Sequence, residues 1–182
     1  MNEQAPEGVR PDPPSGVERL IAHVKTMAPV RTAVVHPCDA LSLGGALDAR
    51  DAGVITPVLV APLAKLRAVA ADMGLELGDT EVVDVPHSHA AAAAAARLAG
   101  KGEVQALMKG SLHSDEYLGA ILAPEACLRT ERRLTHCYIM QTASYPRPFI
   151  ITDAAINIAP TLEIKADIVR NAIDLAHSIG IA

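Results

Sequence analysis

Aromatic side chains are scarce in this chain. Its 182 residues include no tryptophan, one phenylalanine and three tyrosines. Proteins that bind single-stranded nucleic acids stack the bases on aromatic rings, and nucleic-acid binders in general carry a basic surface. The formal net charge here is −5. We therefore expect no nucleic-acid partner, although a local basic cluster on an acidic protein can still bind a small anion.

Long apolar runs and paired cysteines are also missing. No apolar stretch reaches the roughly 18 residues needed to span a bilayer, so we expect no membrane partner. The cysteines, Cys38, Cys127 and Cys137, show no CxxC spacing, which is typical of reduced thiols in a cytoplasmic protein. Residues 1–14 are polar, contain four prolines and lack the pattern of a signal peptide. We expect them to form a disordered tail.

An alternation of strand and helix patterns fills most of the chain. Half of the residues are hydrophobic, which is enough for a core, and short apolar runs alternate with apolar residues at helical spacing. The expected strands are Thr32–His36, Ile55–Ala61, Glu81–Val85 and Val104–Met108. Repeated strand–helix units predict a mostly parallel sheet with helices on both faces. The predicted fold class is α/β, with a three-layer α/β/α architecture.

Capping residues predict where the helices begin and end. The expected caps and stops are, in chain order, Ser15 with Glu18, Asp39, Gly53, Gly74, Ser88 and Ser114. Pro57 lies inside an expected strand, and proline cannot donate a hydrogen bond to a sheet. It therefore predicts an edge strand or an early strand start.

The alternation changes near Pro124–Thr130, where we place a domain change. Leu134–Thr142 and Phe149–Thr152 are typical of strands, and their short connection predicts an antiparallel pair. A helix is expected from about Thr161 to Ile179, with five residues facing inward: Leu162, Ala166, Val169, Ile173 and Ala176. The predicted limits are a tail at residues 1–14, an N-terminal α/β domain at 15–128, and the start of a second, truncated α/β domain at 129–182.

The first candidate site is a loop that follows a strand and precedes a helix. It contains Lys109, Gly110, Ser111 and His113. Glycine lets the backbone approach a ligand, and the start of a helix offers free N–H groups to an anion. Lys109 adds a positive charge. An ordinary β–α turn with a solvated lysine explains the same residues, and geometry alone favours that interpretation.

The second candidate site is a basic cluster of Arg129, Thr130, Arg132 and Arg133. The planar guanidinium group suits bidentate contacts with phosphate oxygens. A solvated run of charges paired with neighbouring glutamates is an equally good interpretation.

The third candidate site is Thr152 and Asp153 with Asn157, at the end of an apolar strand. Polar residues in this position commonly point into a cleft. Both Asp153 and Asn157 are also typical turn residues that hydrogen-bond locally, so turn formation is the alternative.

Other reactive residues give weaker signals. His87 and His89 are too few to hold a metal, and a role at the start of a helix is favoured. Cys38 is better interpreted as an inert thiol than as a nucleophile, because the sequence places no histidine to activate it. No GxGxxG, Walker A or GxSxG motif occurs. We assign no catalytic residue and no metal ligand.

Several of these stretches resemble the phosphate acetyltransferase/phosphate butyryltransferase family. They are Ala46–Val60, Ala106–Leu118, Leu128–His136, Phe149–Pro160 and the following helix Leu162–Ile181. The likeness runs from about Val17 to the end of the chain in the order that the family shows. It is closest to the shorter members, including those fused behind an enoyl-CoA hydratase-type domain.

The resemblance implies transfer of an acetyl or butyryl group between coenzyme A and inorganic phosphate. The implied fold has two α/β/α domains, as in isocitrate and isopropylmalate dehydrogenases, with the active site between them and commonly a homodimer. Coenzyme A, acyl-CoA, phosphate and acyl phosphate are then substrates, and no cofactor is implied. In the usual mechanism a carboxylate helps deprotonate the CoA thiol, which attacks the acyl phosphate carbonyl while basic and hydroxyl groups stabilise the oxyanion.

The same resemblance implies that the reactive groups lie outside this chain. The serine, arginine and aspartate on which the family relies lie beyond the point that matches Ala182, and Gly119 follows Leu118 where some members have an arginine nearby. We expect an N-terminal portion with little activity alone, whose three candidate sites line the substrate. A non-catalytic module that binds CoA or phosphate is the alternative. A dehydrogenase is a weaker one, because no nicotinamide-binding signature is present.

Overall fold

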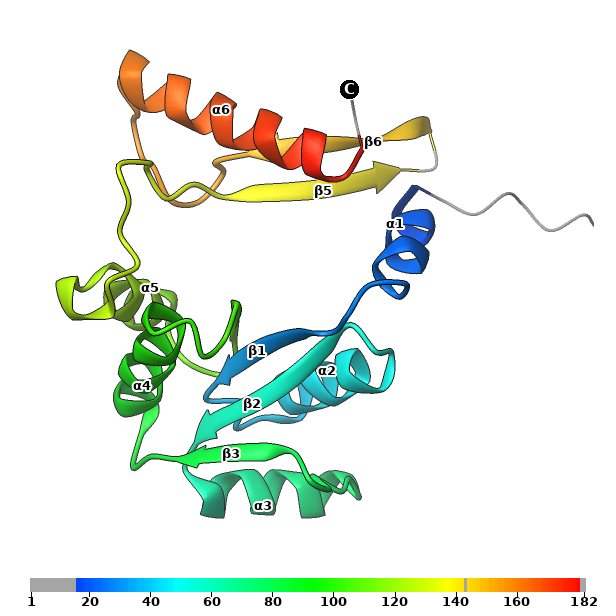
Figure 1. Ribbon diagram of the computed structural model, residues 1–182, viewed down its shortest axis with the longest axis vertical. Coiled ribbons are helices and arrows are strands. Elements are labelled where there is room, and N and C mark those ends of the chain that lie inside the picture. Colours follow the sequence, from blue (N-terminus) through cyan, green and yellow to red (C-terminus); the bar gives the residue numbers. More distant parts are fainter. Residues whose placement is uncertain (1–15, 143, 181–182) are drawn as a thin grey trace, which may run out of the picture. The chain divides into compact units, whose positions relative to one another are not determined.

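The computed structural model describes residues 16–142 and 144–180, which divide into two compact units. The larger unit is residues 24–133, and the smaller unit joins residues 16–23 to residues 134–180. Each unit is described by itself (Figure 1). The predicted tail and the predicted cap Ser15 lie outside the described residues. The predicted domain limits, 15–128 and 129–182, stay a prediction.

A parallel sheet forms the centre of the larger unit. Its strands are β1 (Val30–Val35), β2 (Ile55–Ala61), β3 (Glu81–Asp84) and β4 (Ala106–Lys109). They lie side by side in the order β3-β2-β1-β4, and every pair is parallel. The structure confirms all four expected strands, with their ends moved by at most two residues.

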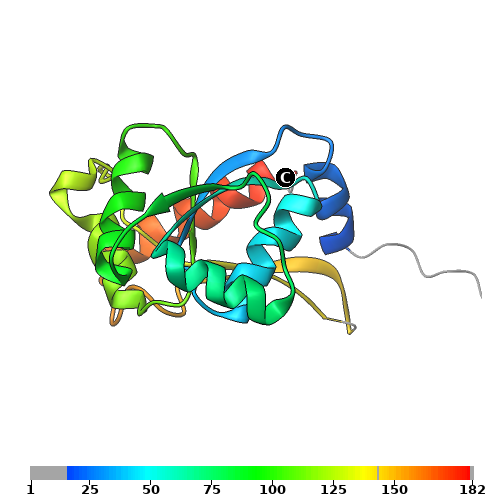
Figure 2. The same ribbon diagram turned by 90° about the horizontal axis from the view of Figure 1, so that it is seen from below.

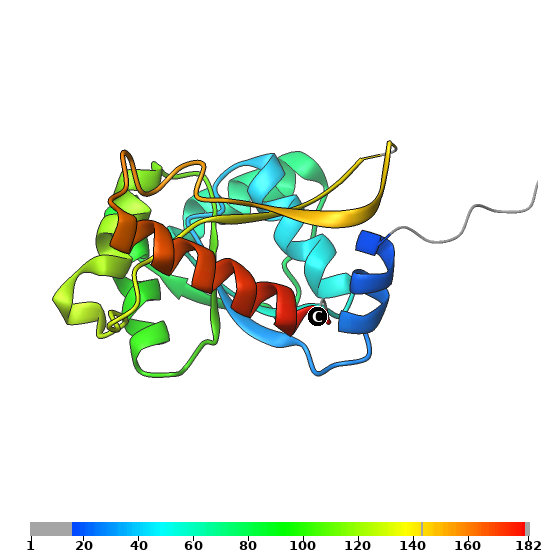
Figure 3. The same cartoon turned by 90° about the horizontal axis from the view of Figure 1, so that it is seen from above.

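Helices cover both faces of this sheet, as the strand–helix alternation predicts. The helices are α2 (Ala40–Asp51), α3 (Leu63–Met73), α4 (Ser88–Gly100) and α5 (Ser114–Leu122), followed by a short 3₁₀ helix, η1 (Pro124–Ala126). Leu43 of α2 and Leu66 of α3 pack in one core with Leu59 of β2, and Figures 2 and 3 show α2 and α3 lying together. Ala95 of α4 packs with Val58 in a second core on the opposite face. The three-layer α/β/α architecture is therefore confirmed for this unit.

Most of the predicted helix limits are also confirmed. The side chain of Asp39 caps α2, its Oδ1 accepting a hydrogen bond from the backbone N–H of Ser42 at 2.7 Å. Gly53 and Gly74 follow α2 and α3 with φ angles of +72° and +64°, which glycine adopts without strain.

Two predicted caps are wrong by one position. α4 begins at Ser88 and α5 begins at Ser114, so the capping positions belong to His87 and His113. His87 Nδ1 accepts a hydrogen bond from the backbone N–H of Ala90 at 3.2 Å. The imidazole of His87 thus caps α4 in place of the Ser88 hydroxyl. This confirms the predicted role of His87 at the start of a helix.

The prediction that Pro57 marks an edge strand is wrong, because β2 lies between β1 and β3. The carbonyl of Val60 accepts a hydrogen bond from His36 after β1, and the carbonyl of Ala61 accepts one from Val85 after β3. The backbone groups of successive β2 residues therefore point in turn toward β1 and toward β3. Pro57 is an even number of residues from Ala61, so its backbone points toward β3. Pairing with β3 begins only at Val58, so the missing N–H of Pro57 leaves no sheet hydrogen bond unmade.

The smaller unit contains helix α1 (Gly16–Val24) up to residue 23, strands β5 (Cys137–Thr142) and β6 (Tyr145–Thr152), and helix α6 (Leu162–Ser178). The predicted antiparallel pairing of β5 with β6 is confirmed, although β6 begins at Tyr145 rather than Phe149. The backbone N–H of Val17 in α1 donates to Gln141 Oε1 of β5 at 3.1 Å. No residue of α1 is buried.

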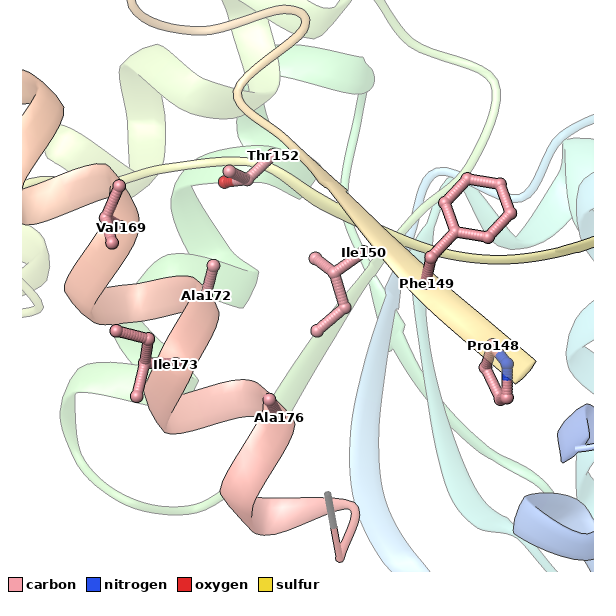
Figure 4. Close-up of a pocket in the computed structure, with 8 residues that line it drawn as sticks. All are labelled: Pro148, Phe149, Ile150, Thr152, Val169, Ala172, Ile173 and Ala176. Atoms are coloured by element: carbon pink, nitrogen blue, oxygen red, sulfur yellow. The ribbon is translucent and has the colours of Figure 1, made fainter. Parts of the chain in front are cut away.

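The predicted inward face of α6 is covered only in part. Val169, Ile173 and Ala176 line an apolar pocket beside β6 (Figure 4), but Leu162, Val169 and Ile173 have exposed fractions of 79%, 52% and 47%. Ile168, which the prediction did not include, is the one buried residue of this helix. The helix thus carries two neighbouring apolar stripes, and the stripe with Ile168 is the better covered by the described residues. Sequence periodicity identifies both stripes but cannot say which one has a partner.

No helix in residues 16–142 and 144–180 is long and apolar enough to cross a membrane.

Deleting a core side chain of β2 tests the packing of the larger unit. Leu59 is fully buried, so Leu59→Ala is expected to lower the free energy of unfolding by about 2–5 kcal/mol. Leu41→Ala removes the same atoms from a residue that is 87% exposed, and its effect should stay within about 0.5 kcal/mol. Urea unfolding followed by circular dichroism measures both. Equal effects of the two substitutions would contradict the described core.

Candidate functional site

The strand order reverses between β1 and β4. From β1 the chain proceeds to β2 and β3 on one side, and it then returns to add β4 on the other side. In open α/β sheets, ligands bind at the carboxyl ends of the strands where the order reverses in this way. The loops at this point are residues 36–39, after β1, and residues 110–113, after β4. The first predicted site loop therefore lies at the switch point of the sheet.

Gly110 allows the two loops to touch. Its backbone N–H donates to the carbonyl of Val35 at 2.9 Å. A Cβ atom at this position would lie 2.5 Å from the Val35 carbonyl oxygen and 2.6 Å from that of His36. No side chain fits between the two backbones, so the position requires glycine. The backbone of Gly110 does approach another group closely, as predicted. That group is the end of β1 and not a ligand.

Ser111 joins the same two loops through its side chain. Its Oγ donates to the carbonyl of His36 at 2.9 Å and accepts from the backbone N–H of Cys38 at 3.1 Å. Its backbone N–H also donates to the His36 carbonyl at 2.9 Å. The hydroxyl hydrogen is thus used inside the protein, where it holds the loop after β4 against the loop after β1.

His36 was missed by the sequence reasoning and lies at the centre of this contact. Its φ angle is +54°, a left-handed conformation that costs a non-glycine residue about 1–3 kcal/mol. Its Nδ1 lies 3.0 Å from the carbonyl oxygen of Ser111. Because a carbonyl oxygen can only accept, Nδ1 carries the hydrogen in this contact. The available signal was a histidine placed between a buried strand and a proline.

The other ring nitrogen of His36 has no partner among the described residues. Nε2 is buried, and the residue as a whole is 8% exposed. An unpaired buried acceptor costs about 1–3 kcal/mol. The switch point therefore combines a strained backbone with an unsatisfied polar atom, and such features cluster at functional sites.

Charges at this point are carried by Lys109 and Asp39. The Lys109 side chain is exposed at the end of β4. Hydrogen bonds from the backbone and the side chain of Ser42 lower the pKa of Asp39, and the positive charge of Lys109 adds a smaller effect in the same direction. A positive and a negative side chain therefore lie near each other at this end of the sheet.

Cys38 lies in the same loop as a protonated thiol. Burial raises the pKa of Cys38, and Asp39 raises it further, which outweighs the opposing effect of Lys65. The thiolate is the nucleophilic form of cysteine. The structure therefore supports the interpretation of Cys38 as an inert thiol.

The start of α5 is a poorer anion site than the sequence suggests. His113 occupies the capping position, is exposed and makes no capping hydrogen bond with its side chain. Asp115 and Glu116 stand in the first turn, where their negative charges occupy the favourable end of the helix dipole. His89 Nδ1 of α4 lies 2.8 Å from Glu116 Oε1.

The basic cluster lies in the loop between η1 and β5, at the end of the larger unit. Arg129, Thr130, Arg132 and Arg133 are all exposed. The backbone N–H of Arg132 donates to Thr130 Oγ1 at 3.1 Å, which fixes a local turn. The exposed positions fit a phosphate contact and a solvated run of charges equally well, so both interpretations stay predictions.

Asp153 and Asn157 form a turn in the smaller unit. Asp153 Oδ1 accepts hydrogen bonds from the backbone N–H groups of Ile156 at 2.9 Å and Asn157 at 3.1 Å, and the Asn157 side chain donates to Asp153 Oδ2. Burial alone would raise the pKa of Asp153, but these hydrogen bonds outweigh it and lower the pKa. The structure shows the turn chemistry that was one of the two interpretations. A contact of these residues with substrate stays a prediction.

The predicted site residues thus fall into two groups. Lys109 to His113 and the basic cluster belong to the larger unit, whereas Asp153 and Asn157 belong to the smaller unit. Within the described ranges, no three histidine, cysteine or acidic residues lie close enough to hold a metal ion.

Residues 88–182 match the family model described as Phosphate acetyl/butaryl transferase. The phosphate acetyltransferase of Rhizobium meliloti is 54% identical over 171 residues, which are 94% of this chain and 54% of the relative. The phosphate acetyltransferase of Rickettsia felis is 54% identical over 88% of this chain and 46% of the relative. The phosphate butyryltransferase of Clostridium acetobutylicum is 32% identical over 89% of this chain and 54% of the relative. The chain spans about half the length of these relatives.

Solved structures show the same fold. A phosphotransacetylase from Streptococcus pyogenes superposes with a TM-score of 0.75 at 14% identity, over 90% of this chain and 59% of that protein. A branched-chain phosphotransacylase from Enterococcus faecalis gives 0.63 at 20% identity, over 82% and 52% of the two chains. These low identities carry the fold alone, and the fold agrees with the predicted α/β/α class.

Adding one methyl group to Gly110 tests the contact between the two loops. Gly110→Ala is expected to separate the loops and to lower the free energy of unfolding by about 2 kcal/mol or more, in the range of overpacked cores. Gly119→Ala is the matched control, since a Cβ there meets nothing within 4 Å inside α5. The control should be neutral or stabilising by up to about 1 kcal/mol. Chemical denaturation of both variants measures this, and a neutral Gly110→Ala would refute the contact.

The turn at Asp153 predicts a pH dependence. Its pKa is lowered in the folded state, so the turn is fully stabilised above the unfolded pKa of about 3.9 and weakens as pH falls through the lower folded value. In NMR spectra, the amide protons of Ile156 and Asn157 should titrate with a midpoint below about 3.9. The same titration should disappear in Asp153→Asn. A midpoint at or above that value would contradict the hydrogen bonds described here.

Proposed function

Because the chain belongs to the phosphate acetyl/butyryl transferase family, we propose that it works in the transfer of an acyl group between coenzyme A and inorganic phosphate. The observation that carries this proposal is the 54% identity to the Rhizobium meliloti phosphate acetyltransferase over 94% of the chain. The identity to the phosphate butyryltransferase of Clostridium acetobutylicum is 32%. The comparison therefore favours acetyl over butyryl as the transferred group.

In this proposal, the larger unit supplies one wall of the substrate site. The loops at the switch point present Lys109 to an anionic group, either the phosphate or the diphosphate of coenzyme A. The exposed arginines of the basic cluster suit bidentate contacts with the same kind of group. Holding both substrates in place and stabilising charge that develops in the transition state are the contributions that fixed polar groups make to such a reaction.

The contact between Gly110, Ser111 and His36 gives this wall its rigidity. Five hydrogen bonds join Gly110 or Ser111, after β4, to Val35, His36 or Cys38 at the end of β1 and in the loop after it. A preorganised wall binds without paying the cost of ordering its loops. We therefore assign Gly110 and Ser111 a supporting role and Lys109 a direct one.

A second candidate function is a non-catalytic module that binds coenzyme A or phosphate. The observation that favours it is the exposed basic side chains of Lys109, Arg129 and Arg132, which can bind an anion without catalysing a reaction. The two functions differ in turnover. The module should bind coenzyme A saturably and form no thioester from acetyl phosphate.

A cytoplasmic location and a homodimer complete the proposal. Both rest on the resemblance to the family. The location also rests on the three cysteines, which show no CxxC spacing and are typical of reduced thiols.

The role of Lys109 is tested by calorimetric titration of the chain with coenzyme A. Replacing an exposed lysine that contacts a phosphate is expected to weaken binding by about tenfold, which corresponds to about 1.4 kcal/mol. Lys109→Gln should show this loss. Lys101→Gln is the matched control, because Lys101 is an exposed lysine that follows α4 and lies outside the proposed site. Its Nζ lies 3.7 Å from Glu103 Oε1. Equal affinities for the two variants would remove Lys109 from the site.

A parallel assay separates the two candidate functions. Acetyl phosphate and coenzyme A are mixed with the purified chain, and thioester formation is followed by its absorbance. Binding without thioester formation supports the module, whereas thioester formation supports the transferase in this chain itself. A chain that neither binds nor turns over would contradict both.

A further inference from the structure

Helices α4 and α5, which lie together in the larger unit (Figure 1), bring a histidine against a buried carboxylate. His89 Nδ1, near the start of α4, lies 2.8 Å from Glu116 Oε1, in the first turn of α5. The Glu116 side chain is 8% exposed, whereas the His89 side chain is 80% exposed. One member of this pair is thus sheltered from water, and the other is accessible to a reagent.

Glu116 needs a hydrogen-bond donor. In the part of the chain that the structure describes, its Oε1 is buried and accepts no hydrogen bond. Removing a carboxylate from water is costly unless it is paired and hydrogen-bonded. His89 Nδ1 is within hydrogen-bond distance, although the ring is not aligned for a linear bond. Because the exposed ring can turn without losing packing, we expect His89 to be the donor that satisfies Glu116.

A carboxylate beside Nδ1 decides which ring nitrogen of His89 can react. In a neutral imidazole, a hydrogen on Nδ1 that points at a carboxylate leaves the lone pair on Nε2. The neighbouring His87 has the opposite arrangement, because its Nδ1 accepts a hydrogen bond from the backbone N–H of Ala90 at 3.2 Å. The hydrogen of a neutral His87 ring is then on Nε2. Of these two histidines, His89 is therefore the one whose outer ring nitrogen is a nucleophile.

The start of α4 suits a phosphoryl group better than the start of α5 does. The first turn of α4 contains no acidic residue, and His89 is the second residue of that helix. The N-terminal end of a helix is the positive end of its dipole, which stabilises a phosphate group nearby. Because α4 follows β3, it begins at the carboxyl end of the parallel sheet, where ligands bind in open α/β folds.

We propose that His89 is a phosphoryl acceptor, which an acyl phosphate modifies and which Glu116 orients. Nε2 of His89 forms a bond to phosphorus, the bond between phosphorus and the acyl oxygen breaks, and the carboxylate, acetate in the case of acetyl phosphate, leaves with the electron pair. The hydrogen stays on Nδ1, where Glu116 balances the positive charge that develops on the ring. Histidine forms covalent intermediates of this kind, and phosphoryl transfer depends mainly on positioning and charge. The choice of donor rests on the proposed function, whereas the pair of residues does not.

The experiment incubates the purified chain with acetyl phosphate and analyses the product by intact mass. Fragment spectra recorded at alkaline pH, where phosphohistidine is stable, locate the added group. The expected result is the mass of one phosphoryl group at His89, and it should be lost after treatment with acid. An unmodified chain, an acetyl group in its place, or a phosphoryl group on His87 would overturn the proposal.

Substitutions test each member of the pair. His89→Gln should abolish the modification, and Glu116→Gln, which keeps the shape of the side chain, should slow it by about tenfold or more. His177→Gln is the matched control, because His177 is an exposed histidine in the last turn of α6, and its chain should be modified like the unsubstituted one. Equal rates for Glu116→Gln and the unsubstituted chain would contradict the role of Glu116.

The ring of His89 gives a second reading that needs no substitution. Nitrogen NMR of the isotope-labelled chain shows which ring nitrogen carries the hydrogen in the neutral form. The hydrogen is expected on Nδ1 of His89, and a hydrogen on Nε2 would contradict the pairing with Glu116.

Thioester formation from acetyl phosphate and coenzyme A is measured separately. Phosphorylation of His89 without thioester formation keeps this proposal and removes the transferase activity from the chain. Thioester formation by a chain whose His89 stays unmodified keeps that activity and overturns this proposal.

Discussion

The close approach of Gly110 to the end of β1 is the constraint on which the candidate site depends. The carbonyl oxygens of Val35 and His36 occupy the space that a side chain would need. Because that space is closed, the loops after β1 and β4 form one surface, and Ser111 fixes it from the other side with its hydroxyl group. Lys109 precedes this contact directly. Its position at the switch point of the sheet is thus set by backbone geometry rather than by its own interactions.

The same contact accounts for the unusual state of His36. Turning the chain sharply after β1 places this residue in a left-handed conformation, and its ring is then held by the carbonyl of Ser111. The remaining ring nitrogen is buried without a partner among the described residues. The strand that leads into His36 is firmly packed, because Val34 and Val35 are fully buried. Strained and unsatisfied residues cluster at functional sites, and His36 combines both features at the switch point of the sheet.

The elements of the larger unit followed from the sequence, because α2 and α3 are followed by Gly53 and Gly74 and because short, mainly apolar strands alternate with helices. Local chemistry of that kind is visible in one stretch of residues. The place of Pro57 in a central strand could not be predicted, because it depends on where β3 begins to pair with β2. The role of His36 could not be predicted either, because it depends on a loop 75 residues away. The covered stripe of α6 could not be predicted for a related reason. Two apolar stripes are present in the sequence, and a partner outside the helix decides between them.

The two units differ in how complete their cores are, and this difference fits the comparisons. The larger unit has helices packed on both faces of its sheet, whereas the smaller unit leaves apolar side chains exposed on two strands and a helix. The chain spans about half the length of the relatives that it matches. The larger unit therefore has the more complete core, and we propose that the loops after β1 and β4 form its ligand surface. Titration of the isotope-labelled chain with coenzyme A, followed by the amide resonances, tests it most directly. The account predicts saturable shifts concentrated at residues 36–39 and 109–113, and shifts confined to other segments, or none, would contradict it.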